Sequence, residues 1–111
     1  MAKRYACIIQ EGQAAEREKA PLEAALRVLG EERFGDDPAD TEVDWVVMKK
    51  GFAWTAGEPS TTSLIIRSVP EGLPLEERES FMHRVCDLWS SQTGCHVGEI
   101  VVTAWEGPLP L

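Results

Sequence analysis

The sequence lacks several features that would assign a function at once. None of its apolar runs approaches the ~20 residues that span a bilayer, and the N-terminal apolar stretch is too short for a signal peptide. It also has no phosphate-binding loop, no Gly-rich dinucleotide turn, no His-Glu-x-x-His and no Gly-x-Ser-x-Gly. We therefore expect a cytoplasmic protein that does not enter membranes and that binds no cofactor.

Positive charge and cysteine are also scarce. The 111 residues include 11 Lys and Arg against 19 Asp and Glu, which gives a net charge of −8. Such a surface repels phosphate backbones, so nucleic acid is not an expected partner. The three cysteines are odd in number and irregularly spaced, which is typical of free thiols in a reducing compartment.

A metal site is not expected. His83, Cys86, Cys95 and His96 form the only cluster of soft ligands, and their spacing matches no common zinc site. Cys86 lies instead on an apolar stripe with Phe81, Val85 and Trp89, which predicts a small core residue. Cys95 and His96 are adjacent and rarely reach one another, which disfavours a nucleophile–base pair.

Two similar halves make up what we expect to be one domain, residues 1–111, with the halves at about 3–50 and 63–106. Each half opens with an apolar strand that ends in Glu-Gly, at 4–12 and 64–72. An amphipathic helix follows, at 75–93 in the second half. In the first half it carries Leu22, Ala25, Leu26 and Leu29, and Pro21 either begins this helix or kinks it after a preceding turn. Second strands follow at 42–48 and 99–105, and residues 49–60 predict a turn or short hairpin.

This order predicts an α+β fold in which two β-α-β repeats form a four-stranded mixed sheet with two helices on one face. The strands carry Ile, Val and Trp on both alternating faces, which argues against a solvated sheet face. We infer that the face without helices packs against other subunits.

Two residues stand out as candidates for ligand contact. Arg67 lies inside an otherwise apolar strand, where its guanidinium could hold a carboxylate. The alternatives for Arg67 are an edge position or an ion pair across a subunit boundary. Trp54 lies between the halves outside any periodic pattern, so it is a candidate pocket wall or subunit contact.

The two halves with their Glu-Gly ends, together with the Gly-rich segment 48–58, resemble the tautomerase superfamily over nearly the whole chain. That superfamily includes 4-oxalocrotonate tautomerase, macrophage migration inhibitory factor and the cis-3-chloroacrylic acid dehalogenases. The resemblance implies a homotrimer with inward-facing sheets. It also implies an N-terminal proline that transfers protons in an apolar pocket, and arginines that bind a substrate carboxylate.

The sequence departs from that pattern at its chemical positions. The position of the proline falls on Lys3, and the chain has no proline before Pro21. The arginine expected after Glu-Gly is Gln13 in one half and Leu73 in the other. Removal of Met1 is expected and would leave the Ala2 amine, so Ala2 and Lys3 are the candidate catalytic residues, with Arg67 and Trp54 as candidate substrate contacts.

We therefore expect a tautomerase-like homotrimer that binds a small molecule able to carry a carboxylate, with the family proton transfer lost or strongly altered. If the protein is active, its substrates would be small 2-oxo acids or enols. The same element order is also found in ferredoxin-like domains, so a dimeric ligand-binding module or small cofactor-free enzyme is the alternative.

Overall fold

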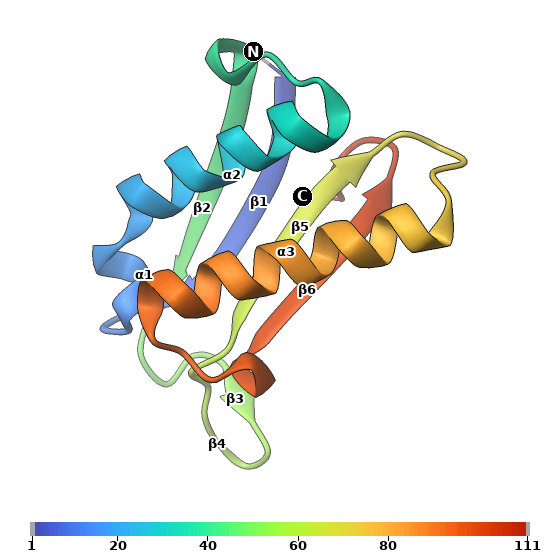
Figure 1. Ribbon diagram of the computed structural model, residues 1–111. Helices are drawn as coiled ribbons and strands as arrows, with labels where there is room; N and C mark the ends of the chain where they lie inside the picture. Colours follow the sequence, from blue (N-terminus) through green and yellow to red (C-terminus); the bar gives the residue numbers. More distant parts are fainter. Residues whose placement is uncertain (1, 111) are drawn as a thin grey trace.

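The computed structural model describes residues 2–110 as a four-stranded mixed sheet with two long helices on one face (Figure 1). The α+β fold predicted from the sequence is confirmed. The first β-α-β unit consists of β1 (Ala2–Gln10), α1 (Ala14–Arg17), α2 (Lys19–Phe34), the 3-10 turn η1 (Pro38–Asp40) and β2 (Thr41–Met48). The second consists of β5 (Ser63–Val69), α3 (Leu75–Thr93), the turn η2 (Val97–Glu99) and β6 (Ile100–Glu106). A hairpin, β3 (Trp54–Thr55) and β4 (Glu58–Pro59), connects them.

The sheet order is β2-β1-β5-β6, so the two strands of each β-α-β unit are direct neighbours and run parallel. The halves join through the antiparallel pair β1–β5, in which Tyr5 lies opposite Arg67 and Cys7 opposite Ile65. A ferredoxin-like sheet would instead split each β-α-β unit with an intervening strand. The observed order is therefore that of two equivalent units, and the ferredoxin-like topology is not present.

The helix boundaries follow from local sequence signals. The short helix α1 ends before Glu18, and α2 begins at Lys19 with Pro21 in its first turn, where a missing N–H costs no helical hydrogen bond. Both alternatives for Pro21 thus hold in part, since a turn precedes it and the main helix starts beside it. Gly35 and Gly94 end α2 and α3 in the left-handed conformation, at φ 69° and 73°.

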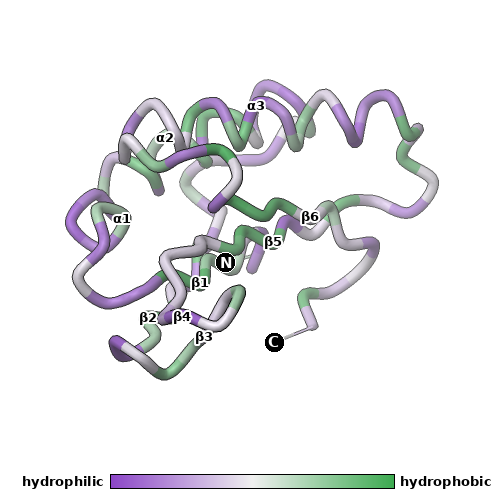
Figure 2. Tube along the Cα trace, turned by 90° about the horizontal axis from the view of Figure 1, so that it is seen from below, coloured by the Kyte–Doolittle hydropathy of each residue, from purple (hydrophilic) through white to green (hydrophobic). Residues whose placement is uncertain are grey.

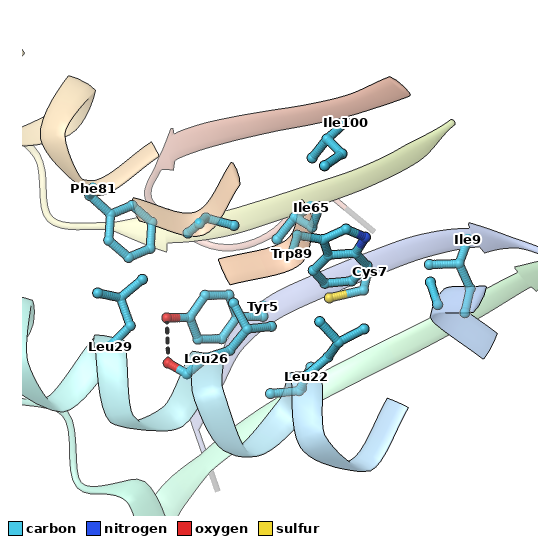
Figure 3. Close-up of a cluster of buried hydrophobic side chains, with 13 residues drawn as sticks. Tyr5, Cys7, Ile9, Leu22, Leu26, Leu29, Ile65, Phe81, Trp89 and Ile100 are labelled. Atoms are coloured by element: carbon cyan, nitrogen blue, oxygen red, sulfur yellow. Dashed lines mark hydrogen bonds between the residues drawn. The ribbon is translucent and has the colours of Figure 1, made fainter. Parts of the chain in front are cut away.

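The core lies between the helices and the sheet (Figure 3). Trp89 and Phe81 of α3 and the leucines of α2 pack onto Tyr5, Cys7 and Ile65, all of which are fully buried. Burial raises the pKa of the Cys7 thiol. Cys86, predicted as a core residue, packs against this cluster but stays half-buried.

The other sheet face is apolar and has no helix over it, and it is exposed only in part, since Ala6 and Ile66 on it are buried. It carries the residues that alternate with the core positions: Ala6, Ile8, Val46, Leu64, Ile66, Val101 and Trp105, here called the open face. Val46, Val101 and Trp105 are 40%, 49% and 45% exposed. Both long helices lie on the opposite side of the sheet, whereas the hairpin and the residues after β6 lie on the open side (Figure 2). Within residues 2–110, no helix is long and apolar enough to cross a membrane.

Candidate functional site

A polar cavity lies at the amino-terminal end of β1, where the resemblance places the catalytic proline. Its volume is about 390 Å³. The end of α2, the loop into η1, the start of β1 and the end of β5 form its walls. The lining residues are Arg4, Phe34, Gly35, Asp36, Asp37, Asp40, Arg67, Ser68, Val69 and Pro70.

Arg67 forms the floor of this cavity and is paired within the chain. Its Nη1 and Nη2 donate to the two carboxylate oxygens of Asp36 at 2.5 and 3.0 Å, and its Nε donates to the Ser68 carbonyl at 2.7 Å. The guanidinium is 1% exposed and lies between the rings of Tyr5 and Phe34, 4.9 and 4.4 Å from their centroids. A ligand carboxylate could reach Arg67 only by displacing Asp36.

Arg67 occupies neither of the structural positions that the sequence left open. An edge position is wrong, because β5 lies inside the sheet between β1 and β6. The ion pair is present, but its partner Asp36 belongs to the same chain. Asp36 was not predicted from the sequence, although its place directly after the helix-ending Gly35, as the first of two adjacent aspartates, is a signal that could have identified it.

Burial and the ion pair shape the protonation of this cluster. Burial opposes the charge on Arg67, but hydrogen bonding to Asp36 and the proximity of Tyr5 together raise the pKa of Arg67 above its ordinary value. Burial also raises the pKa of Tyr5 to about 12, with Arg67 acting in the opposite direction. Tyr5 stays neutral and donates its hydroxyl hydrogen to the Leu26 carbonyl at 2.9 Å. Both pKa shifts favour a charged Arg67 beside a neutral Tyr5.

Arg4 is the more accessible arginine of the cavity. Its side chain is 40% exposed, and its Nε lies 3.8 Å from Asp36 Oδ1. The register between β1 and β2 shifts between Lys3 and Tyr5, so the strand pairing is irregular at Arg4. Because Asp36 already accepts two hydrogen bonds from Arg67, Arg4 retains donor capacity toward an anion in the cavity.

The two candidate catalytic residues lie at the start of β1. Ala2 pairs with Thr41 of β2, and Met1, whose removal the sequence suggests, lies outside the described residues. The Lys3 Nζ lies 3.5 Å from Asp44 Oδ2, and its side chain is 61% exposed. The structure thus brings Ala2, Lys3 and Arg67 to the same end of the sheet.

Trp54 lies at the other end of the sheet. It belongs to the hairpin that follows the carboxyl end of β2, and it is 63% exposed. Its Nε1 donates to the Gly51 carbonyl at 2.7 Å, which fixes the indole on the hairpin. Within one chain, Trp54 therefore does not share a site with Ala2, Lys3 and Arg67.

Two of the four soft ligands considered from the sequence, His83 and Cys86, lie close together in the structure. His83 and Cys86 line a second, apolar cavity between α3 and β6. Burial, with a contribution from Asp87, raises the pKa of the Cys86 thiol. Among residues 2–110, no three His, Cys, Asp or Glu side chains are arranged to hold a metal ion.

Comparison with known proteins rests on solved structures, because no protein-family model and no curated protein matches the chain. Native Ps01740 superposes with a TM-score of 0.85 at 22% identity, covering 96% of this chain and 95% of its own. N1, a member of the cis-3-chloroacrylic acid dehalogenase family, gives 0.83 at 14% identity, covering 96% and 76%. The Q0 fused 4-OT, a symmetric trimer, gives 0.79 at 18% identity, covering 96% and 86%.

The chain has the tautomerase fold. The resemblance stated from the sequence is thereby confirmed at the level of the fold. The cavity lies beside the start of β1, where the resemblance places the family's proton-transfer site. Ala2, Lys3 and Arg4 stand there in place of a terminal proline, and of these three only Arg4 lines the cavity.

Proposed function

We propose that this chain is a tautomerase-superfamily protein that forms a homotrimer and binds a small molecule able to carry a carboxylate. In this proposal the family proton transfer is lost or strongly altered. The exposure of Val46, Val101 and Trp105 on the open face is the single observation that carries it, since a lone chain would leave these apolar side chains in water. The Q0 fused 4-OT, a solved trimer with this fold, supports the same assembly.

The proposed ligand site is the cavity at the start of β1. Arg4 would hold the ligand anion, because Asp36 already binds the guanidinium of Arg67. Arg67 would act indirectly, by holding Asp36 in place beside Arg4. Ala2 and Lys3 remain the groups that could move a proton there. The Lys3 side chain is 61% exposed and its Nζ lies 3.5 Å from Asp44 Oδ2, so it lacks the enclosed position of a general base.

The assembly is tested by light scattering on a sizing column across a dilution series. The wild type should keep the mass of a trimer. A Val46→Asp variant should dissociate, because it puts a charge on the open face at a position already 40% exposed. Val28→Asp is the matched control, since Val28 is 56% exposed on α2 and should leave the trimer intact. A monomeric wild type would refute the proposed assembly.

The chemistry is tested on small 2-oxo acids in the same preparation. Enol–keto conversion should stay near the buffer rate, and ligand binding by Arg4→Met should be weaker than that of the wild type. Conversion at family-like rates would contradict the proposed loss of activity. If activity is found, a Lys3→Ala/Arg67→Ala variant that keeps all of it would exclude both residues from the reaction.

A further inference from the structure

The cavity at the start of β1 has one side chain with hydrogen-bond donors left for an anion. The Arg67 guanidinium is committed to Asp36 and to the Ser68 carbonyl. The Ser68 hydroxyl donates to the Gly107 carbonyl at 2.5 Å. Of the lining side chains that can donate a hydrogen bond, Arg4 is therefore the one that can hold a ligand carboxylate.

The same lining carries carboxylates that are outside the buried ion pair. Asp37 is exposed and has no ion-pair partner among residues 2–110, and Asp40 also lines the cavity. The Asp37 Oδ1 atom accepts the Ala39 N–H at 3.0 Å, and a carboxylate has acceptor sites for about four hydrogen bonds. Asp37 can therefore accept further hydrogen bonds from a positively charged group in the cavity.

The carboxyl-terminal end of α2 makes the potential in this part of the cavity more negative. Phe34, the last residue of α2, and Gly35, which ends it, both line the cavity. The last carbonyl groups of a helix together act as about half a negative elementary charge, which stabilises nearby cations. The N–H groups of Gly35 and Asp36 donate to carbonyls of the last turns, so they are not available to an anion.

A ligand with both signs of charge fits this lining better than a simple anion. A purely anionic ligand would gain the contact with Arg4, but it would also face Asp37 and the end of α2, which repel it. An ammonium group on the same ligand turns that repulsion into attraction. The cavity volume of about 390 Å³ is at the lower end of the roughly 300–1,000 Å³ of small-molecule sites, which suits a ligand the size of an amino acid.

We propose that the ligand of this cavity is an amino carboxylate, with its carboxylate on Arg4 and its ammonium group at Asp37 and the carboxyl-terminal end of α2. This inference rests on the proposed function and names the chemical class of ligand for the same site. It makes Asp37 the residue that selects an amino acid over an oxo acid with the same carbon skeleton.

Three ligands with one carbon skeleton test the proposal: 2-aminobutanoate, 2-oxobutanoate and butanoate. Their affinities for the full chain are measured by isothermal titration calorimetry at one low ionic strength, because salt screens exposed charges. The wild type should bind 2-aminobutanoate about fivefold more tightly than butanoate, which is the upper range for an ion pair that water reaches. 2-Oxobutanoate, which lacks the ammonium group, should show no such advantage.

Asp37→Asn removes the charge of the carboxylate but keeps a side-chain oxygen for the Ala39 N–H, so the turn η1 should stay folded. In this variant the advantage of 2-aminobutanoate over butanoate should fall to about twofold or less. Butanoate itself should bind at least as tightly as it does to the wild type. Asp87→Asn is the matched control, because Asp87 is an exposed acid of α3 that does not line the cavity, and it should leave all three affinities unchanged.

An Arg4→Met variant separates this inference from the proposed function, because it should weaken the binding of all three ligands, each of which carries the carboxylate. Equal affinities of the three ligands for the wild type, or an advantage of 2-aminobutanoate that survives Asp37→Asn, would overturn the amino-carboxylate inference. If binding still required Arg4 in that case, the proposed carboxylate site would stand. Binding of none of the three ligands would overturn the inference and the proposed ligand site together.

Discussion

We predict that replacing Gly30 with alanine destabilises the fold, because the new methyl group would disturb the buried Asp36–Arg67 ion pair. Gly30 lies inside α2, where alanine would ordinarily stabilise a helix by about 1 kcal/mol. A Cβ added to Gly30 would, however, clash with Asp36 Oδ2 and lie 2.9 Å from Arg67 Nη1 and 3.2 Å from the Tyr5 hydroxyl oxygen. The Asp36–Arg67 pair would have to move apart inside the core.

The expected net effect follows from two opposing magnitudes. Separating a buried ion pair costs about 3–5 kcal/mol, and the helix preference of alanine returns about 1 kcal/mol. Gly30→Ala should therefore lower the free energy of unfolding by about 2–4 kcal/mol. For a chain of this size, at about 4 °C per kcal/mol, the melting temperature should fall by roughly 8–16 °C.

Urea denaturation at one fixed protein concentration measures the change, since dissociation of an oligomer would otherwise shift the midpoint. An Asp36→Ala/Arg67→Leu background provides the control, because it removes both charged groups that the new methyl group would displace. In that background Gly30→Ala should cost nothing or stabilise by up to about 1 kcal/mol. A stabilising effect of Gly30→Ala in the otherwise wild-type chain would refute the reasoning.

Two further predictions concern buried titratable groups. The pKa of Tyr5 is raised to about 12 by burial, so the neutral phenol favours folding fully below about pH 10, and this contribution is lost as the pH rises toward 12. Between pH 10 and 12 the unfolding free energy of the wild type should therefore fall by about 2–3 kcal/mol more than that of Tyr5→Phe. Urea denaturation at several pH values measures both, and an equal fall in the two proteins would contradict the assignment. Cys7 is fully buried and its pKa is raised, so a thiol reagent should modify the half-buried Cys86 and Cys95 in the folded protein and reach Cys7 only on unfolding. Equal rates at Cys7 and Cys86 would show that the core opens more readily than its packing suggests.

Much of the fold could be predicted because the signals that set it are local. The helix predicted at 75–93 is α3, since its apolar residues repeat at helical spacing and Gly94 ends it in the left-handed conformation. The Ala56-Gly57 turn between β3 and β4 has positive φ at both residues, 53° and 80°, which closes the short hairpin expected in 49–60. Helix α1 was not separated from α2, because four residues are too few to show a period.

The partners of the charged groups could not be predicted in the same way. Arg67 and Asp36 are 31 residues apart, and they meet only because β5 pairs with β1 in the register that sets Arg67 opposite Tyr5. The end of α2 then brings Asp36 over that position. No pattern in the sequence specifies the register of two strands from different halves, so the buried arginine was visible but its partner was not.

The charged side chains near the cavity already have partners within the chain, whereas several large apolar side chains are exposed to water. Arg67 has a carboxylate partner with two hydrogen bonds, and Lys3 has Asp44, so both side chains have a partner before any ligand arrives. By contrast, Val46, Val101 and Trp105 on the open face are 40–49% exposed, and Phe52 and Trp54 of the hairpin are 75% and 63% exposed. Burying apolar surface is the main source of association energy, whereas displacing Asp36 from Arg67 would cost several kcal/mol. We therefore propose that assembly with further copies comes first and that a ligand is held by groups such as Arg4, whose side chain is 40% exposed in the single chain.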